Sequence, residues 1–512
     1  MASPSTLATA RLTAVVPRRA PRRVATPAPP VEPYKKNLDC SLQCPHFQSC
    51  SGCSHELNLD RPDVLHGVRN FFVGNGVKDF SFHSEKLWEW RCRAKLAVRG
   101  TPNEPLVGLY EEGTHNVVDI PLCKERYFFI LLLIQFINLL GIVELNIRPY
   151  DEDSDIGEVR YVQMAVTTHN TSLPLAERYS QGKVQLTLVW NSQDEQSPNS
   201  KKLSELSNFL WKNGGPRCGM HLIHSIWVNF QTSNTNTIFG NKWSHLEGER
   251  DFWEHLGGID TTIDPASFGQ ANTQAFNSLL RKVQNYVPKG SSVVDLYSGS
   301  GVIGLSVAAA RKCRSVKCVE INKESKASFE KSLSRLPKTI DCAISWHNSD
   351  ASLEPLHWLV GSDVVIVDPP RKGLHPSLLD ALQKVSLSNK KVASKLESSV
   401  VRAKKEKRPW ILRAREASVQ VESGTNLDGD QVWPSTLIYI SCGWDSFKED
   451  CKSLVGKNGW HLEKAHAFNF FPGTHSVEVL AIFKRGPSDS LKKKKKKKKK
   501  KEKKEKAKKN NS

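Results

Sequence analysis

Residues 292–310 read SVVDLYSGSGVIGLSVAAA, and this stretch decides the fold. Its first five residues are mostly apolar, which is typical of a buried strand, and a glycine-rich turn then leads directly into a run of small apolar residues typical of a helix. Strand-like and helix-like runs alternate from about residue 259 to residue 485. This alternation predicts an α/β fold, with a parallel sheet flanked by helices and ligands at the carboxyl edge of the sheet.

The turn in this stretch carries a nucleotide-binding pattern. Gly299, Gly301 and Gly304 satisfy G-x-G-x-x-G, and Glu320 ends the next strand-like run, where a ribose-binding carboxylate is expected. That pattern by itself indicates a dinucleotide site. Asp295 favours another ligand, because a carboxylate there can meet the ammonium group of S-adenosylmethionine and would repel a pyrophosphate. We therefore expect a methyl donor, with a nicotinamide-dependent oxidoreductase as the alternative.

Three further chemical groups follow towards the C-terminus. The run DVVIVDPPRKG places Asp368 at the carboxyl edge of the sheet, where it can accept hydrogen bonds from a base or an amine. Cys442 ends the strand-like run LIYIS and is a candidate nucleophile. Glu478 lies between two valines, where a carboxylate is costly to bury unless it has a partner or a chemical role.

The N-terminal part contains a cysteine cluster. The chain has 12 cysteines, and the sequence shows no secretory signal, which favours thiols or metal ligands over disulfides. The spacing Cys44-x5-Cys50-x2-Cys53 supplies three ligands. A tetrahedral site needs a fourth, either Cys40 or a remote cysteine such as Cys123. These residues favour a metal or iron–sulfur site without deciding between the two.

The net charge of +20 lies at the two ends of the chain. Residues 1–36 carry seven basic residues and one acid, and residues 492–509 carry 15 lysines and two acids, so the remaining body is nearly neutral. The leader, rich in Ala, Pro, Ser and Arg, is typical of an organelle transit peptide. We expect a chloroplast, with a mitochondrion or, because of the lysines, the nucleus as alternatives. Residues 486–512 are expected to form a disordered tail.

Two internal segments stand out. Phe128–Leu140 is strongly apolar but too short to span a bilayer, so a buried helix is predicted and no transmembrane segment is expected. Residues 385–434 form a long polar insertion in the α/β region, which is either functional or disordered.

Several motifs, taken in order, resemble those of the RNA uridine-5-methyltransferases. The chain resembles a plant organelle-type member of that family. They are the cysteine spacing, Phe268-x-Gln270-x-Asn272, Asp295 to Gly301, Asp-Pro-Pro-Arg at 368–371, Ser441-Cys442, and Phe471-Pro472 to Glu478. The resemblance covers roughly residues 40–60 and 259–485. It implies a cysteine cluster segment at 37–60, a β-rich α+β RNA-facing region at 61–255, and a class I, Rossmann-like methyltransferase domain at 259–485.

The resemblance also implies roles for individual residues. Cys442 would be the nucleophile and Glu478 the general base in methyl transfer to carbon 5 of uridine in tRNA or rRNA. Contacts to S-adenosylmethionine and the target base would come from Gln270, Tyr297, Glu320 and Asp368. A [4Fe–4S] cluster would be held by Cys44, Cys50, Cys53 and Cys123. We expect a monomer that binds RNA and no membrane.

One departure from the family and two rival functions matter. Gly443-Trp444 follows Cys442 where the family usually has Asn-Pro, which keeps open an RNA-binding protein with a degenerate site. A cytosine-5 methyltransferase is the other rival, but those enzymes place a Pro-Cys pair after the aspartate of this strand, and here Arg371 follows Pro370.

Overall fold

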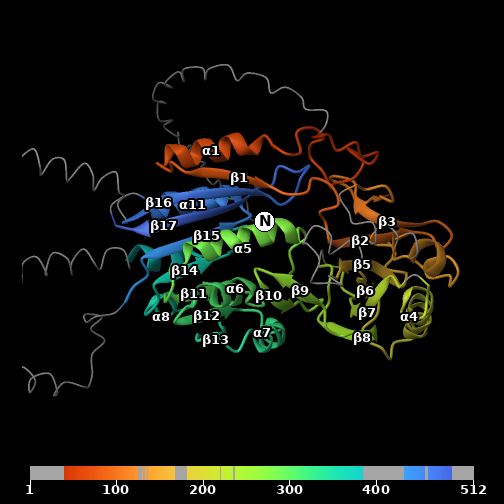
Figure 1. Ribbon diagram of the computed structural model, residues 1–512. Helices are drawn as coiled ribbons and strands as arrows, with labels where there is room; N and C mark the ends of the chain where they lie inside the picture. Colours follow the sequence, from red (N-terminus) through yellow and green to blue (C-terminus); the bar gives the residue numbers. More distant parts are fainter. Residues whose placement is uncertain are drawn as a thin grey trace, which may run out of the picture.

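The computed structural model describes residues 40–124, 130, 133–134, 137–167, 182–219, 221–234, 237–384, 432–455 and 459–486. They build two large sheets, an eight-stranded one and a seven-stranded one, which occupy the left and right of Figure 1. The expected transit peptide, the Lys-rich tail after residue 486 and nearly all of the polar insertion lie outside the described residues.

The eight-stranded sheet is the predicted parallel sheet. Its order is β1-β16-β17-β15-β14-β11-β12-β13. The strands are β1 (Phe80–Ser84), β11 (Ser292–Leu296), β12 (Ser315–Glu320), β13 (Ala343–Asn348), β14 (Val364–Val367), β15 (Thr436–Ser441), β16 (Trp460–Asn469) and β17 (Glu478–Arg485). Only β17 runs antiparallel to its neighbours. The strand order reverses between β11 and β14, and ligands of open α/β sheets bind at such a point.

Helices cover both faces of this sheet. They are α1 (Val64–Gly74), α5 (Thr273–Tyr286), α6 (Val302–Arg311), α7 (Ser325–Ser334), α8 (Pro355–Leu359) and α11 (Trp444–Leu454). Alternate residues of each central strand enter opposite cores: Val294 packs with α1, α8 and α11, whereas Val293 packs with α5 and α6. Burial on both faces explains why these strands are almost wholly apolar.

The predicted boundary of the central region is wrong for residues 64–84. β1 pairs in parallel with β16, with Phe80 opposite Ala465, and α1 packs into the core of the eight-stranded sheet through Val68 and Phe72. The N-terminal part of the chain therefore completes the sheet built by the C-terminal part, as the red and blue elements of Figure 1 show. Sequence reasoning missed this because an edge strand carries no signal of its partner.

The seven-stranded sheet gives the β-rich central region that was expected. Its strands are β2 (Arg93–Gly100), β3 (Pro105–Tyr110), β4 (Val117–Asp119), β5 (Val159–Val166), β6 (Val184–Trp190), β7 (Ile223–Phe230) and β8 (Lys242–Gly248), in the order β4-β3-β2-β5-β6-β7-β8. Only β6 and β7 are parallel, and α4 (Ser200–Gly214) connects them. A hairpin of β9 (Trp253–Leu256) and β10 (Ile259–Thr262) then leads to the eight-stranded sheet.

The apolar stretch near residue 130 lies in the core of the seven-stranded sheet. Ile130, Leu133 and Ile134 are helical and fully buried, and the π-helix η2 (Ile137–Ile142) follows them and contacts α4. The prediction of a buried helix is confirmed for these described residues. Within the described part of the chain, no helix has the length and hydropathy needed to cross a membrane.

Candidate active site

A cleft of about 520 Å³ opens at the carboxyl edge of the eight-stranded sheet. Its size is typical of a small-molecule site. All six residues that the sequence assigned to catalysis and cofactor binding line it: Gln270, Tyr297, Glu320, Asp368, Cys442 and Glu478. These residues come from six different segments of the chain, and the fold brings them to one place.

The glycine-rich turn forms one wall of the cleft. Tyr297, the first residue after β11, has a φ of 63°, a left-handed conformation that is uncommon for a bulky residue. Gly301 has a φ of 78°, and a Cβ there would lie 2.4 Å from the ring of Phe329, so only glycine fits. Glu320 holds the turn in place, because its Oε2 accepts a hydrogen bond from the Gly299 N–H at 2.8 Å.

Asp295 does not do what the sequence suggested. Its carboxyl is fully buried under α6, where Oδ2 accepts a hydrogen bond from the Gly304 N–H at 2.9 Å. Burial raises the pKa of Asp295 to about 8, and the hydrogen bond from Gly304 offsets this only in part. Asp295 is absent from the lining of the cleft, so the expected contact with an ammonium group is wrong. Successive side chains of a strand point to opposite faces of the sheet, and Asp295 lies on the face that packs against α6.

The loop that carries Gln270 is fixed from both sheets. Asn272 caps α5, with Oδ1 accepting from the Ala275 N–H at 3.0 Å, while its Nδ2 donates to the Phe470 carbonyl at 3.0 Å. On the other side, the Cys92 N–H, just before β2, donates to the Ala271 carbonyl at 2.8 Å. Gln270 therefore lies at the junction of the two sheets, with its neighbours held on both sides.

Cys442 and Glu478 face each other across adjacent strands. Ser441 of β15 pairs with Val479 of β17, so continuing this antiparallel register by one residue places Cys442 opposite Glu478. Side chains at such positions lie close together. Burial raises the pKa of the Cys442 thiol, and the negative charges of Glu478 and Asp368 raise it further, whereas Arg371 opposes the shift.

The cleft contains more acidic groups than its cations balance. Burial raises the pKa of Asp368 to about 7. Burial and the neighbouring Asp368 also raise the pKa of Glu478, which is only 4% exposed, and Arg371 again acts in the opposite direction. Sequence reasoning gave no role to Arg371, although the Asp-Pro-Pro-Arg motif contains it. A ligand that carries positive charge would relieve this excess of buried acid.

The departure at Gly443-Trp444 has a structural explanation. A Cβ on Gly443 would lie 2.4 Å from the Arg371 carbonyl oxygen, so glycine allows the two active-site loops to touch. Ser446 also donates to this carbonyl at 2.7 Å. Trp444 packs against Phe71 of α1, with ring centroids 5.3 Å apart, and does not line the cleft.

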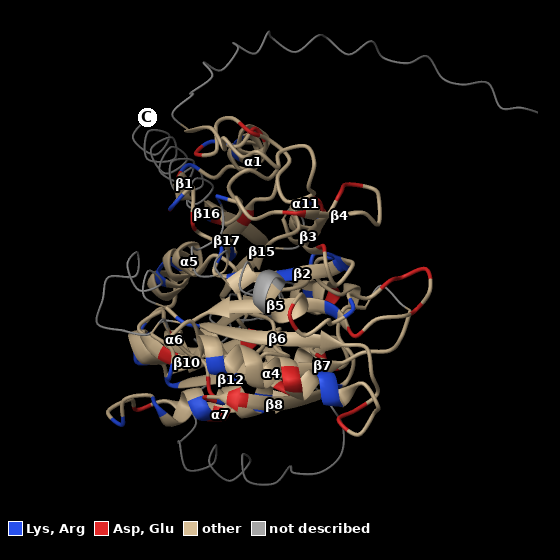
Figure 2. Cartoon of the chain, turned by 90° about the vertical axis from the view of Figure 1, so that its right-hand side faces the viewer, with Lys and Arg blue, Asp and Glu red and all other residues tan. Residues whose placement is uncertain are grey.

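A second, basic pocket adjoins the cleft. Its volume is about 280 Å³, and it shares Ser267, Phe268 and Gly269 with the cleft. Its cations are Arg91, Arg93 and Lys95, all from the WRCRAKL segment. Over the wider face drawn in Figure 2, by contrast, basic and acidic residues are interspersed, in keeping with a nearly neutral body. The basic character is therefore local to the mouth of the cleft.

The cysteine segment lies against the seven-stranded sheet but does not form a ready metal site. Cys50 and Cys123 pack against the same core, and the His46 ring accepts a hydrogen bond from the Leu122 N–H at 3.3 Å. Across the described residues, however, three or more metal-binding side chains are nowhere gathered into one group. The four thiols thus fit an iron–sulfur cluster in chemistry but not in their present geometry.

The sheet order, the glycine-rich turn after β11 and the cleft at the point of reversal define a class I methyltransferase fold. The tRNA (uracil-54, C5)-methyltransferase of Pyrococcus abyssi, solved in complex with S-adenosyl-L-homocysteine, shares this fold with a TM-score of 0.55. The two chains are 21% identical, and the similarity covers 87% of this chain and 86% of that one.

Sequence comparisons define the family. An uncharacterised RNA methyltransferase of Protochlamydia amoebophila is 37% identical over 454 residues, which cover 87% of this chain and 98% of the relative. Another, from Bacillus cereus, is 23% identical over 470 residues, covering 88% and 84%. Residues 267–420 also match the family described as conserved hypothetical protein 95. The chain belongs to the RNA methyltransferase family.

Proposed function

We propose that this protein transfers a methyl group from S-adenosylmethionine to carbon 5 of a uridine in tRNA or rRNA. The observation that carries the proposal is the position of the Cys442 thiol opposite the Glu478 carboxyl in a cleft rich in buried acid. A thiol nucleophile and a nearby base are what substitution at carbon 5 of a pyrimidine requires. The cytosine rival has less support, because its Pro-Cys pair is replaced by Pro370-Arg371.

The residues of the cleft fit the methyl donor. Asp368 and Glu320 offer carboxylates to the cationic and hydroxyl groups of S-adenosylmethionine, and Tyr297 offers an aromatic ring at the strand end. Negative potential in the cleft favours the sulfonium and disfavours a pyrophosphate, which argues against a nicotinamide cofactor. When bound, S-adenosylmethionine supplies the methyl group as an electrophile.

The chain's own residues account for the other steps. The Cys442 sulfur adds to carbon 6 of uracil, which pushes electron density onto carbon 5 and makes that carbon nucleophilic. After carbon 5 has gained the methyl group, Glu478 takes the proton from carbon 5. The bond between the Cys442 sulfur and carbon 6 then breaks, restoring the thiolate and the double bond of the base.

The pKa shifts suggest an order of binding. In the free protein, the raised pKa values of Cys442 and Glu478 favour the thiol and the carboxylic acid, which are the inactive forms. A cation in the cleft lowers both pKa values by charge attraction. Binding of the methyl donor therefore prepares the nucleophile and the base together.

The basic pocket provides a place for the RNA backbone. Arg91, Arg93 and Lys95 can contact phosphates beside the target nucleotide, while Phe268, 84% exposed, lies on the boundary with the cleft. The target base must leave its stack to reach Cys442, which costs less in a loop than in a duplex. A loop of folded RNA is the substrate that we propose.

The decisive experiment uses full-length protein, labelled methyl donor and unmodified tRNA or rRNA fragments. We expect label on carbon 5 of uracil, and a covalent complex with RNA that contains 5-fluorouridine. Cys442→Ala should lose both, whereas Cys451→Ala, which alters a buried cysteine of α11, should keep both. Label on cytosine, or an adduct that persists in Cys442→Ala, would contradict the proposal.

Two further expectations from the sequence are proposed here. We propose that Cys44, Cys50, Cys53 and Cys123 hold a [4Fe–4S] cluster, because Cys50 and Cys123 pack against one core and Cys44 and Cys53 flank Cys50 in the sequence. Anaerobically purified protein should contain iron and sulfide, and stoichiometric zinc would refute this.

We also propose that residues 1–36 direct import into chloroplasts, which a fusion of this segment to a fluorescent protein would test.

A further inference from the structure

The cysteine segment touches the turn that precedes Glu478. This turn, residues 471–476, connects β16 to β17, and its first residue lines the cleft. The N–H groups of Ser54 and His55 both donate to the Gly473 carbonyl, at 2.8 and 3.1 Å. Two consecutive donors on one acceptor fix the position of that carbonyl better than one donor could.

Side chains strengthen the same contact. The Ser54 hydroxyl accepts a hydrogen bond from the His475 N–H at 3.0 Å. The His55 Nε2 lies 3.2 Å from the Thr474 carbonyl, and the rings of His55 and His475 are 5.4 Å apart. Every residue from Gly473 to His475 is thus contacted by Ser54 or His55, which immediately follow Cys53 in the sequence.

The first residues of the turn have other contacts, and Pro472 and Gly473 are buried. Thr474 hydrogen-bonds within the turn, through its N–H and its hydroxyl to the Phe471 carbonyl, and Phe471 packs edge-on against Trp90. Only two residues, Ser476 and Val477, separate the contacted stretch from Glu478. A shift of the turn would therefore reach Glu478 through Val477, which is buried in the core of the eight-stranded sheet.

We propose that Ser54, assisted by His55, is a positioning residue for Glu478, so that the cysteine segment sets the geometry of the catalytic base. This inference rests on the proposed function, since it concerns the group that removes the proton from carbon 5. Ser54 does not line the cleft in which the donor and the target base would bind. Its influence passes through the turn alone, and it concerns one step of the reaction.

The consequence is a selective defect. Addition of Cys442 to carbon 6 depends on β15, whereas the hydrogen bonds of Ser54 go to Gly473 and His475. Proton removal depends on Glu478, and a displacement of about 1 Å in such a group can slow a step by roughly a hundredfold. Loss of the Ser54 hydroxyl should therefore slow the release of the RNA from its covalent adduct more than the formation of that adduct.

The test compares three variants of the full-length protein. Ser54→Ala removes the hydroxyl and Ser54→Thr retains it. The control, Ser51→Ala, changes an exposed serine between Cys50 and Cys53. In single-turnover reactions with uridine RNA, Ser54→Ala should accumulate the adduct and form product about ten- to a hundredfold more slowly. Ser54→Thr should restore the wild-type rate, and Ser51→Ala should match wild type.

A second readout needs no RNA. Hydrogen exchange of the backbone amides at residues 473–477 should be faster in Ser54→Ala than in Ser54→Thr, because the His475 N–H loses its acceptor. If wild type transfers no methyl group to uridine, the proposed function fails, and this inference fails with it. If wild type is active but Ser54→Ala shows neither faster exchange nor adduct accumulation, only the positioning role is refuted. An equal slowing of adduct formation and release would also refute it.

Discussion

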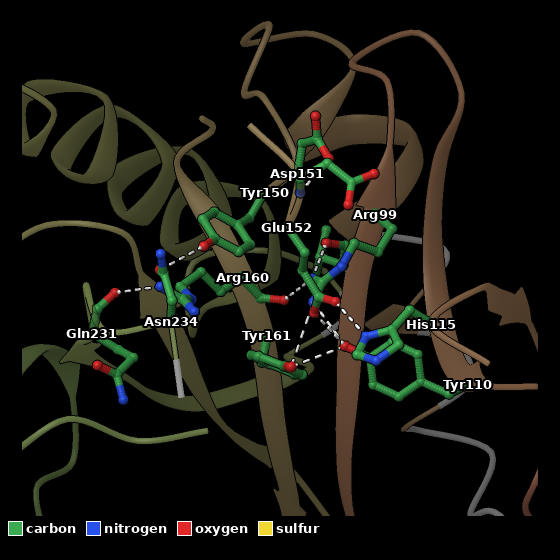
Figure 3. A network of polar contacts seen from close by, with 12 residues as sticks. Arg99, Tyr110, His115, Tyr150, Asp151, Glu152, Arg160, Tyr161, Gln231 and Asn234 are labelled. Carbon is green, nitrogen blue, oxygen red and sulfur yellow. Dashed lines mark hydrogen bonds and ion pairs between the residues drawn. The ribbon is translucent and has the colours of Figure 1, made fainter. Parts of the chain in front are cut away.

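Two clusters of polar groups, one in each sheet, differ in how their charges are balanced. In the cleft, the acids Asp368 and Glu478 lie near the Cys442 thiol, and Arg371 is the opposing charge that acts on Glu478 and Cys442. In the seven-stranded sheet, a network around Arg99 pairs its charges directly (Figure 3). Only the first cluster has the raised carboxyl pKa values that mark chemical sites, whereas the pKa of Glu152 is lowered by its hydrogen bonds to His115 and Arg99.

The Arg99 network satisfies its cation from several directions. The guanidinium donates to a Glu152 carboxylate oxygen, to the Tyr110 hydroxyl at 2.7 Å and to the Arg160 carbonyl at 2.9 Å. It also lies 5.1 Å from the centre of the Tyr161 ring. Burial alone lowers the pKa of Arg99, but Tyr110, Glu152 and Tyr161 raise it by more.

The difference teaches what each cluster is for. A matched pair of buried charges is costly to break but performs no chemistry, because neither partner gains by changing its protonation state. Unbalanced acids destabilise the free protein and respond strongly to any cation that enters. We therefore expect substitutions in the cleft to change activity and substitutions around Arg99 to change stability.

Glu478→Gln should give the largest effect. Loss of the general base should slow turnover by roughly 10²–10⁴-fold and let the RNA adduct accumulate. The variant should also be more stable than wild type above pH 5. The folded-state pKa of Glu478 is raised, so stability is complete below the unfolded pKa and falls as the pH rises, by about 1.4 kcal/mol for each unit of the shift.

Turnover and urea unfolding, measured at pH 4.5 and pH 8, test this pair of effects. The free energies of unfolding of the two proteins should converge at the lower pH. A variant that is slower and also less stable at pH 8 would mean that Glu478 is a paired structural group, like Glu152, and the contrast between the clusters would disappear.

Arg99→Met should have the opposite effect to Glu478→Gln: lower stability with unchanged turnover. Removal of the cation leaves the Glu152 carboxylate, which is 31% exposed, without its main partner. We expect a loss of about 2–3 kcal/mol in the free energy of unfolding and unchanged turnover per folded molecule. Arg61→Met is the control, because Arg61 forms only an exposed ion pair with Asp60 and should change stability by less than about 1 kcal/mol.

The same contrast marks what the sequence could predict. The fold class and the six cleft residues were predictable, because strand ends and short motifs place them at one edge of a parallel sheet. The Arg99 network was not, since Arg99, Tyr110 and Glu152 come from separate segments that only the antiparallel register and the β4–β5 connection bring together. Pairing between distant segments leaves no local pattern.

Two misplaced expectations have related causes. Asp295 stands in the motif, but its side chain faces α6, and the motif alone does not say which face of the strand it occupies. The family resemblance implies a central region at 61–255, which includes β1, although β1 pairs with β16 from the other end of the chain. Both depend on packing between elements, which sequence spacing does not encode.

Binding of S-adenosylmethionine should depend on pH through Asp368. Its pKa is about 7, and only the carboxylate attracts a cation, so affinity should weaken as the pH falls below 7, by up to about tenfold per unit. Calorimetry from pH 5.5 to pH 8.5 would measure this. S-adenosylhomocysteine, which lacks the sulfonium charge, should show a weaker dependence, and Asp368→Asn should flatten both curves. Equal slopes for the two ligands would show that the buried acids do not sense the sulfonium.

The smallest effect is expected from Tyr110→Phe. Its hydroxyl accepts from Arg99 and donates to Glu152 at 2.9 Å, but Arg99 and Glu152 contact each other without it. Loss of one such hydrogen bond costs about 1 kcal/mol, measurable by urea unfolding. The Tyr110 carbonyl accepts the Ser51 N–H at 3.0 Å, so this residue also borders the cysteine segment. Unchanged turnover would show that the paired network acts on stability alone. Slower turnover with adduct accumulation, as expected for Ser54→Ala, would instead show that the Arg99 network affects catalysis through the cysteine segment. That result would contradict the expectation that this network acts on stability alone.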